Sequence, residues 1–429
     1  MLDVHLIRTD PDALHSAIRK RGESADIVRL VALDDEYRRL LGESERLKAE
    51  RNARSKEIGA LIGSGREDEA ETLKTEMRGV SDRIGALDDQ ADAHKETRDA
   101  LLLELPNLPH ESVPSGDGSA NRVVRAWGEP RDLGFEARPH WDIGASLGIL
   151  DQERAAKISG SGFVGLTGDG AALSRALITF MLERHRARGY REIAPPFLVN
   201  PETATATGHL PRFEEQLYAA ERDDLYLIPT AEVPIMGWHR DEILAADHLP
   251  IRYCAHTACF RREAGAHGRD TRGLIRVHQF DKVELFKITT PETSYDELES
   301  LTADAEAILQ ALGLPYRVVL LAAGEMGNAA AKTYDLEVWA PGVGTWLEVS
   351  SCSNCEAYQS RRANLRFKEG NGASTRYPHT LNGSAVALPR TLIAILENYQ
   401  NADGGVTVPE VLRPYLSGMA TLAPPGSEG

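Results

Sequence analysis

The chain has 429 residues, a formal net charge of −16, 42% hydrophobic residues and 27% charged residues. This length predicts two or three domains, and the composition supports a sizeable buried core. No run approaches the roughly 20 apolar residues of a membrane span, and the acidic start is unlike a secretory signal, so we expect a cytoplasmic protein without a membrane partner. The acidity also argues against DNA as a partner, because the averaged field repels phosphate.

The first predicted element is a pair of long helices. Apolar positions recur in alternating steps of three and four at 30–61 and again at 73–101, which is a heptad pattern. Gly63 and Gly65 interrupt the pattern between the two segments. Two such seams joined by a short turn predict an antiparallel coiled-coil arm at about 30–101, roughly 50 Å long at about 1.5 Å per residue.

The charge of this arm is uneven, because the first helix is basic along much of its length and the second is rich in Glu and Asp. One interpretation is a solvated coiled coil with ion pairs across it. The other is a basic edge that follows a phosphate backbone. The candidate RNA contacts on the first helix are Arg38, Arg46, Arg51 and Arg54.

A segment rich in Pro, Gly and Ser, residues 106–118, ends the helical pattern. We therefore expect an N-terminal domain at 1–110, a second domain at 111–418 and a disordered tail at 419–429. The second domain mixes helix patterns with strand patterns such as LIRVHQFDKVELFKI and YDLEVWAPGVGTWLEVSS. This mixture predicts an α+β domain built on a largely antiparallel β-sheet.

A glycine-rich segment, Gly160–Gly165, matches the G-x-G-x-x-G pattern of dinucleotide sites. That pattern binds pyrophosphate only where it follows a strand and opens a helix. Here the preceding LDQERAAKIS reads as a helix, and the next helix is expected only near Ala171. We interpret the segment as a connection between elements.

Four cysteines form two local pairs, Cys254 with Cys259 and Cys352 with Cys355. They are too few for a disulfide framework, which suits a reducing compartment. The pairs differ in spacing and lie in apolar, strand-like stretches, so we expect packing residues and no zinc. Three histidines near the arginine-rich stretch, His267, His278 and His379, lack paired ligand spacing and are expected to be ordinary hydrogen-bonded residues.

The stretch FRREAGAHGRDTRGLIR, residues 260–276, gathers five arginines around a glycine-rich turn: Arg261, Arg262, Arg269, Arg272 and Arg276. Strand patterns flank the turn. Arginines on adjacent strands can bind several phosphate oxygens at fixed distances. The alternative is a hairpin whose exposed arginines pair with Glu263, Asp270 and Asp281, and this stretch alone does not decide between the two.

Two further stretches accompany it, RARGYREIAPPFLV upstream and LNGSAVALPRTLIAILENYQ downstream. In this order the three stretches resemble the three motifs of the class II aminoacyl-tRNA synthetases. The words TAE at 230–232, TRGLIRVHQFDKVE and EVSSCSNCEAYQSRRANLRF, together with the arm, resemble the bacterial-type seryl-tRNA synthetases. The resemblance covers nearly the whole chain.

The resemblance implies ATP as a substrate and Mg²⁺ as its companion ion. Arg261, Glu348 and Arg390 match catalytic positions, and Glu348 and Ser351 match metal ligands. The residues matching the ATP site are Arg261, Arg262, Glu263, Arg276, Phe280, Glu348, Val349, Ser350, Ser351 and Arg390. The residues matching the serine site are Thr230, Ala231, Glu232, Glu284, Asn382 and Ser384. Which of them contacts the ammonium and which the hydroxyl of serine stays open.

The resemblance further implies a serine–tRNA ligase that activates L-serine with ATP and transfers it to tRNA(Ser), with tRNA(Sec) an open second partner. It implies an arm that binds the tRNA, and a homodimer through the helix after Leu173 and the strand near Pro196. Two alternatives are an enzyme that loads a carrier protein, whose relatives lack the arm, and an inactive paralogue, which would lack Arg261, Glu348 or Arg390.

Overall fold

The computed structural model describes residues 1–264, 272–370 and 372–424. These residues form two compact units. The arm unit comprises Leu2–Arg19 and Glu23–Leu105, and the core unit comprises Met1, Lys20–Gly22 and Pro106–Gly429. Arg269, His267 and Asp270, which the sequence singled out, lie outside the described residues.

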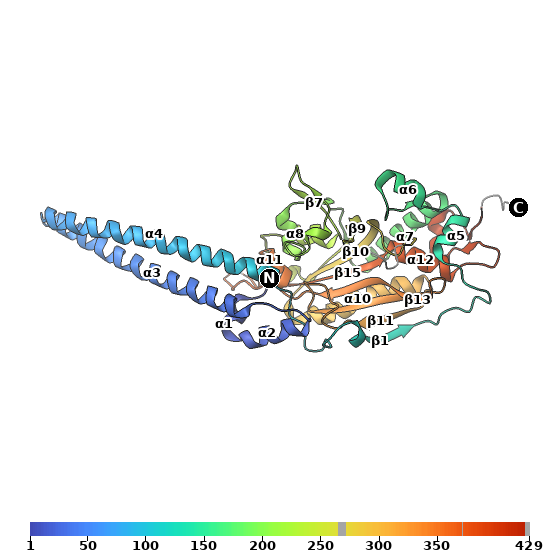
Figure 1. The fold of residues 1–429 in the computed structure, drawn as a ribbon, viewed down its shortest axis with the longest axis horizontal. Helices are drawn as coiled ribbons and strands as arrows, with labels where there is room; N and C mark the ends of the chain where they lie inside the picture. The colour runs from blue at the N-terminus through green and yellow to red at the C-terminus, as the bar shows by residue number, and fades with distance from the viewer. Residues whose placement is uncertain (265–271, 371, 425–429) are drawn as a thin grey trace. The chain divides into compact units, whose positions relative to one another are not determined.

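The arm unit is a helical hairpin, as predicted. Its helices are α1 (Val4–Thr9), α2 (Pro11–Lys20), α3 (Ile27–Gly63) and α4 (Glu67–Glu104). The long helices α3 and α4 lie side by side and antiparallel (Figure 1). The chain reverses between them at Gly65, whose φ of 78° lies in the left-handed region that glycine adopts without strain.

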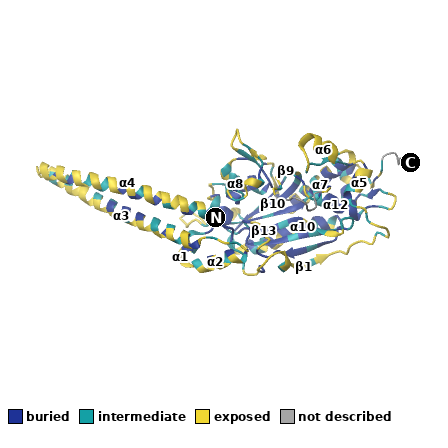
Figure 2. Cartoon of the chain, in the orientation of Figure 1, coloured by how far each residue is buried: buried dark blue, intermediate teal, exposed yellow. Residues whose placement is uncertain are grey.

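The heptad seam is apolar only over part of the hairpin. One buried cluster contains Leu40, Leu47, Ile84, Leu87 and Ala91. Nearer the tip, predicted seam residues such as Ile58 and Leu61 are only partly buried, and Figure 2 shows that part of the hairpin mostly exposed. The tip therefore depends more on helix propensity and surface ion pairs than on a core.

A buried ion cluster interrupts the seam near the base of the hairpin. The predicted seam residue Leu33 is only half-buried, whereas the neighbouring Asp34 is 1% exposed. Arg8 Nε donates to Asp34 Oδ2 at 2.6 Å, and Arg98 Nη1 donates to Asp34 Oδ1 at 2.7 Å. The Arg98 guanidinium also lies over the ring of Tyr37, 5.1 Å from its centroid. Pairing on both sides offsets the desolvation of this carboxylate.

The core unit is built on an eight-stranded sheet with the order β1-β11-β12-β13-β15-β10-β9-β4. All neighbours are antiparallel except β4 and β9. The largely antiparallel sheet predicted from the sequence is confirmed. The strands, in that order, are Arg122–Trp127, Tyr316–Leu320, Lys332–Ala340, Thr345–Asn354, His379–Ala387, Gln279–Thr289, Ile251–Phe260 and Arg191–Glu192.

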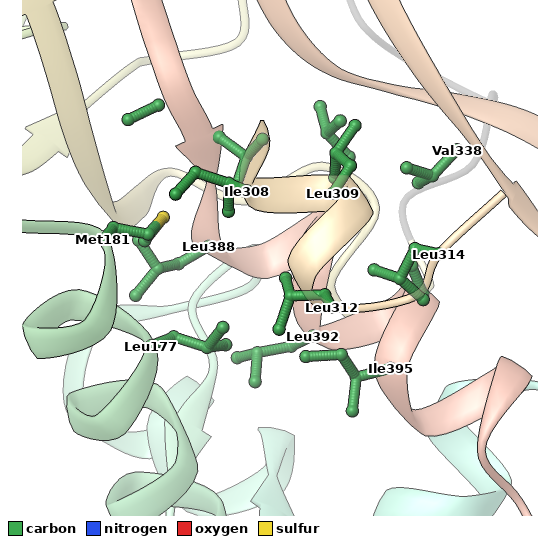
Figure 3. Close-up of a cluster of buried hydrophobic side chains, with 14 of the residues drawn as sticks. Leu177, Met181, Ile308, Leu309, Leu312, Leu314, Val338, Leu388, Leu392 and Ile395 are labelled. Carbon is green, nitrogen blue, oxygen red and sulfur yellow. The ribbon is translucent and has the colours of Figure 1, made fainter. Parts of the chain in front are cut away.

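Three helices share one hydrophobic cluster with this sheet: α7 (Gly168–Ala187), α10 (Ser294–Ala311) and α12 (Leu388–Asn398). Figure 3 shows side chains of all three converging, together with Val338 of β12. The residues labelled there are Leu177, Met181, Ile308, Leu309, Leu312, Leu314, Val338, Leu388, Leu392 and Ile395. This packing fixes α12, which carries Arg390 in its first turn.

The remaining elements are short. The other helices are α5 (His140–Ser146), α6 (Gln152–Ser159), α8 (Pro201–Thr207), α9 (Glu232–Gly237) and α11 (Tyr358–Arg362). The small sheets pair β2 (Leu150–Asp151) with β3 (Gly165–Leu166), β7 (Leu225–Leu227) with β5 (Leu198–Val199) and β6 (Ala219–Ala220), β8 (Ile243–Ala245) with β14 (Arg366–Lys368), and β16 (Val406–Thr407) with β17 (Thr421–Leu422). None of the helices in the described ranges has the length and apolarity of a bilayer span.

Two sequence predictions need correction. The strand expected from residue 274 begins only at Gln279, because the amide of His278 donates to the carbonyl of Gly162 and not to a neighbouring strand. The disorder expected from residue 419 does not hold for Thr421–Leu422, since this pair forms β17 and Leu422 is buried.

The Asp34 cluster generates a stability prediction for the arm unit. Asp34→Ala removes the carboxylate that lies between Arg8 and the buried guanidinium of Arg98. Arg98 still pairs with Asp99, so the stability of the hairpin should fall by about 2–3 kcal/mol. Hydrogen exchange of α3 and α4 in the whole chain measures this change. Asp35→Ala is the control, because its exposed carboxylate lies 3.7 Å from Arg38 and should matter by less than about 0.5 kcal/mol.

The stabilisation of the hairpin by Asp34 should depend on pH, and its direction follows from the pKa of this carboxyl group. The hydrogen bond from Arg8 lowers the pKa of Asp34 below its ordinary 3.8. A lowered pKa in the folded state means that the stabilisation is present above pH 4 and is lost as pH falls through the folded pKa. Equal exchange rates for the Asp34 and Asp35 variants at pH 7 would contradict a structural role for this cluster.

Candidate active site

The core unit contains a cavity of about 360 Å³ over the surface formed by β10, β13 and β15. Most of the site residues predicted from the sequence line it. They are Thr230, Glu232, Arg261, Glu263, Arg276, Phe280, Glu284, Glu348, Val349, Ser351, Asn382, Ser384 and Arg390. Ala231, Arg262 and Ser350 are not among its lining residues.

Strand pairing brings these distant residues together. β10 lies between β9 and β15, and its pairing places Glu284 opposite Ser384 and Phe286 opposite Asn382. Side chains alternate along a strand, so Phe280, Lys282 and Glu284 of β10 share one face. That face forms the floor of the cavity, because all three residues line it.

The inner part of the cavity holds two carboxylates and one lysine. Lys282 Nζ lies 2.5 Å from Glu284 Oε2, and the two side chains are 8% and 3% exposed. Glu232 Oε1 accepts a hydrogen bond from Gln359 Nε2 at 2.5 Å. Burial, and then the charge of Glu284, raises the pKa of Glu232 to about 7. Two acids against one cation favour a small ligand that carries a positive charge.

One carboxylate oxygen in this cluster could accept a further hydrogen bond. Within the described residues, Glu284 Oε2 has no hydrogen-bond partner, although the Lys282 ammonium is close enough for an ion pair. Its contact with the Lys282 ammonium uses only part of its capacity, because a carboxylate oxygen can accept two hydrogen bonds. The oxygen is therefore a candidate acceptor for an N–H or O–H group of a ligand.

The outer part of the cavity combines arginines with an aromatic ring. Arg261 Cζ lies 5.1 Å from the ring centroid of Phe280. Arg276 Nη1 donates to Glu263 Oε2 at 2.5 Å. Glu263 has a φ of 50°, a conformation that is costly for a non-glycine residue and is often found at functional sites. Guanidinium groups beside a flat ring suit a ligand that has both phosphates and an aromatic base.

The start of α12 contributes the third arginine. Arg390 Nη1 donates to the carbonyl and to Oε2 of Glu348 at 2.7 and 3.1 Å, and Arg390 Nε donates to the carbonyl of Ile275 at 3.2 Å. β13 and β15 are paired only at Ser353 and Asn354, so they separate toward Glu348. This separation leaves room for the Arg390 side chain.

Ser350 and Ser351 are neighbours on β13, but their side chains make different contacts. Ser350 Oγ donates to the carbonyl of Ser384 at 2.6 Å and bridges the separating strands, which explains its absence from the cavity lining. The next residue, Ser351, donates from Oγ to Asp335 Oδ1 at 2.7 Å and does line the cavity. Consecutive residues of β13 thus have different roles.

Asp335 is a site neighbour that the sequence analysis missed. Burial, and then the nearby carboxylate of Glu348, raises its pKa well above the ordinary value. Together with Ser351 these groups form a set of hard oxygen donors, which fits Mg²⁺. The described residues contain no group of three or more His, Cys, Asp and Glu side chains that could hold a metal alone, so a ligand would have to supply further oxygens.

Lys282 and Gln359 were missed as well, for different reasons. Lys282 is detectable in principle, because it lies two residues from both Phe280 and Glu284 on a strand. Gln359 comes from α11, and no spacing in the sequence links it to Glu232. Only the fold brings those two side chains together.

The cysteines and histidines are placed as ordinary structural residues. All four cysteines are free and buried. Burial raises the pKa of Cys254 and of Cys352 to about 12, so both are uncharged thiols at neutral pH. His278 Nδ1 lies 2.9 Å from the carbonyl of Arg261, and His379 Nδ1 lies 2.8 Å from Ser294 Oγ, which are the hydrogen-bonded roles predicted for them.

Comparison with known proteins bears on both units. Residues 1–109 match the family model of the seryl-tRNA synthetase N-terminal domain, and residues 213–399 match that of the class II tRNA synthetase core domain (G, H, P, S and T). A serine–tRNA ligase of Geobacillus thermodenitrificans is 55% identical over 419 residues, 97% of this chain and 98% of the relative. One of Roseiflexus castenholzii is 53% identical over 424 residues, 98% and 99% of the two chains.

A solved structure agrees with these matches. The structure of seryl-tRNA synthetase from Pyrococcus horikoshii complexed with ATP superposes with a TM-score of 0.94 at 39% identity, covering 99% of this chain and all of that one. The matches to both units and the similarity over nearly the whole chain agree on one family. The chain belongs to the seryl-tRNA synthetases, within the class II aminoacyl-tRNA synthetases.

Proposed function

We propose that this protein is a serine–tRNA ligase, which activates L-serine with ATP and transfers the seryl group to the 3′ end of tRNA(Ser). One observation carries the proposal: the acidic cluster of Glu232, Lys282 and Glu284 shares a cavity with Arg261, Arg276 and Arg390. The first group suits a small ammonium compound and the second a polyphosphate. Relatives named serine–tRNA ligase are 52–55% identical over nearly the whole chain.

In the first step, the carboxylate of serine attacks the α-phosphorus of ATP, the new O–P bond forms in line, and pyrophosphate leaves. Arg261 is assigned to the α-phosphate and the serine carboxylate, Arg276 and Arg390 to the remaining phosphates, and Phe280 to the adenine ring. These groups position the reactants and neutralise charge, and no side chain has to serve as a nucleophile. Mg²⁺ that arrives with ATP would be held by Glu348 and Ser351 and would supply further charge neutralisation.

Selectivity is assigned to the inner part of the cavity. Thr230, Glu232, Glu284, Asn382 and Ser384 line the cavity and are assigned to the ammonium and hydroxyl groups of serine. Alanine and glycine lack the hydroxyl and would leave buried polar groups unpaired, a penalty that can reach roughly 10⁴-fold. Threonine differs by one methyl group and must be excluded by shape, which discriminates less.

The arm is assigned to tRNA. Arg38 and Arg54 pair with acids of their own helix, Asp35 at 3.7 Å and Glu57 at 2.8 Å. Pairs across the arm also exist, for example Arg83 with Glu43 at 2.6 Å, so part of its charge serves the coiled coil.

Two other arginines of the first helix differ from these. In the described ranges, Arg46 and Arg51 have no acidic partner within 4.0 Å. They are therefore better suited than Arg38 and Arg54 to contact a phosphate backbone, which double-stranded RNA presents for recognition by shape. In keeping with this function we also propose a cytoplasmic homodimer formed through α7 and the segment near Pro196.

The activation step is tested by pyrophosphate exchange with each amino acid in turn. We expect exchange to be strongest with serine, and strongest exchange with any other amino acid would overturn the proposal. Arg261→Ala and Arg390→Ala should each abolish it, because a lost charge clamp costs about 3–4 kcal/mol of transition-state stabilisation by analogy with oxyanion donors. Arg317→Ala is the control, since Arg317 pairs with Glu337 on the sheet and does not line the cavity.

The raised pKa of Glu232 predicts a pH dependence. Below about pH 7 this carboxyl group is increasingly protonated, so it attracts the ammonium of serine less strongly. The KM for serine in exchange should therefore rise as pH falls from 8 to 6, while the KM for ATP changes little. Glu232→Gln should raise the KM for serine and abolish its dependence on pH. A wild-type KM for serine that is flat across this range would show that the charge of Glu232 is not used.

Replacing residues 30–101 by a short Gly/Ser linker tests the arm. α3 and α4 pack against each other, so we expect the core unit to fold and pyrophosphate exchange to persist, while transfer to tRNA is lost. An arm-less protein that charges tRNA(Ser) as efficiently as wild type would reduce the arm to a structural coiled coil.

A finer test neutralises the unpaired arginines. Arg46→Gln together with Arg51→Gln should weaken tRNA binding and reduce its salt dependence by about two phosphate contacts, because fewer counterions are released. Arg78→Gln is the control, since Arg78 lies on the acidic helix, 3.8 Å from Glu71. An equal loss of tRNA affinity in both proteins would count against a specific basic edge.

A further inference from the structure

A fully buried histidine–carboxylate pair lies outside the cavity, next to a segment that lines it. His140 is the first residue of α5 and Glu397 lies in the last turn of α12, and both side chains are 0% exposed. His140 Nδ1 lies 2.8 Å from Glu397 Oε1. On its other side, His140 Nε2 accepts a hydrogen bond from the backbone N–H of Leu274 at 3.0 Å. The ring thus joins the end of α12 to the chain just after the arginine-rich turn.

These two contacts define the state of the ring. An amide N–H can only donate, so the Nε2 that receives it carries no proton. The ring proton is therefore assigned to Nδ1, from which it is donated to Glu397. His140 is a neutral imidazole whose donor and acceptor are both in use.

Glu397 holds the ring in place. Its Oε1 also accepts from the backbone N–H of His140 at 2.9 Å, and its Oε2 accepts from the backbone N–H groups of Gly342 and Val343 at 2.8 and 3.1 Å. Four donors saturate the two oxygens of a carboxylate. The carboxylate, and with it the imidazole, has one orientation.

The segment that His140 holds carries much of the outer cavity. Leu274, Ile275, Arg276 and Val277 all line it. Within this segment, the carbonyl of Ile275 accepts from Arg390 Nε, and Arg276 is itself one of the cavity arginines. A shift of the segment would therefore move two guanidinium groups at once.

The backbone at Gly273 lies directly against the His140 ring. Gly273 has a φ of 66°, and a Cβ at this position would lie 2.1 Å from His140 Nε2. Only glycine therefore permits this approach of backbone to ring. α5 and α6 hold the same segment further: the guanidinium of Arg272 lies 4.8 Å from the ring centroid of Trp141, and Gln152 Nε2 donates to the Gly273 carbonyl at 3.3 Å.

We propose that His140 is a positioning residue for the ATP site, with Glu397 as its anchor. The unprotonated Nε2 of the ring fixes the amide of Leu274, and thereby holds the segment that presents Arg276 and orients Arg390 toward the polyphosphate. Neither His140 nor Glu397 lines the cavity, so neither touches the reacting atoms. The inference rests on the proposed function in assigning this part of the cavity to ATP.

Two substitutions separate the two nitrogens. His140→Asn keeps a donor near the position of Nδ1 and loses the acceptor for Leu274. His140→Gln keeps an acceptor near the position of Nε2. Both lose the edge contact of the ring with Trp141, whose centroid is 4.8 Å away, so they are matched for packing.

The affinity for ATP is measured by calorimetric titration with ATP and MgCl₂, without serine. We expect His140→Gln to bind ATP within about threefold of wild type and His140→Asn to bind it about tenfold or more weakly, because a buried amide then lacks its acceptor. In pyrophosphate exchange, the KM for serine should stay within about twofold of wild type in both variants. Equal ATP affinities for the Asn and Gln variants, or a parallel loss of ATP and serine affinity, would overturn the proposal.

If the His140 variants do not fold, a second pair of variants tests the proposal. Gly273→Ala places a methyl group against Nε2 and should weaken ATP binding as His140→Asn does. Gly344→Ala is the control, because Gly344 has a similar φ of 74° with nothing within 4 Å of its added Cβ. Equal ATP affinities for these two variants would also overturn the proposal.

Different measurements would refute this proposal and the proposed function. Wild-type protein without serine-dependent exchange would refute the function. The ATP titrations test His140 in either case, because they need no amino acid and no turnover.

Discussion

The antiparallel pairing of β10 with β9 on one side and β15 on the other is the constraint on which the site depends. It places residues that lie about a hundred positions apart in the chain, such as Glu284 and Ser384, directly opposite each other. Because side chains alternate along a strand, a one-residue slip of β10 would turn Phe280, Lys282 and Glu284 away from the cavity together. The large core shared by α7, α10 and α12 makes such a slip costly, since every core residue of β10 would be exposed with it.

The cavity contains both cationic and anionic side chains, although the protein as a whole is acidic. Two of the cavity arginines are held in pairs that a ligand can replace: Arg276 with Glu263, and Arg390 with Glu348. These pairs are partly exposed, so each contributes little to stability and costs little to exchange for phosphate. The inner pair of Lys282 and Glu284 is buried and behaves differently, because removing either partner would leave an uncompensated charge. The outer cavity can therefore reorganise around an anionic ligand, whereas the inner cavity is set in advance for a small ligand.

Sequence reasoning succeeded where periodicity carries the information. The heptad steps predicted α3 and α4, and alternating runs predicted β10, β12 and β13. It failed where a contact between distant parts of the chain determines the structure. Asp34 is buried in the seam because Arg8 and Arg98 surround it. The strand does not begin at residue 274 because the amides of Leu274 and His278 bind His140 and Gly162. Most site residues were found through motif resemblance. Lys282, Asp335, Gln359 and His140 were missed, since burial of a titratable group next to a particular partner is a property of tertiary structure.

Different interactions make the two units rigid. In the core unit, saturated polar networks such as that of Glu397 give side chains one orientation, which suits chemistry that depends on distances between reacting atoms. In the arm unit, apolar burial is concentrated away from the tip, and the tip residues rely on local ion pairs and helix propensity. Segments with few buried contacts open at low free energy. A hairpin with a packed base and a weakly held tip can adapt its tip to a partner, while the strands that carry Glu284 and Ser384 keep their register.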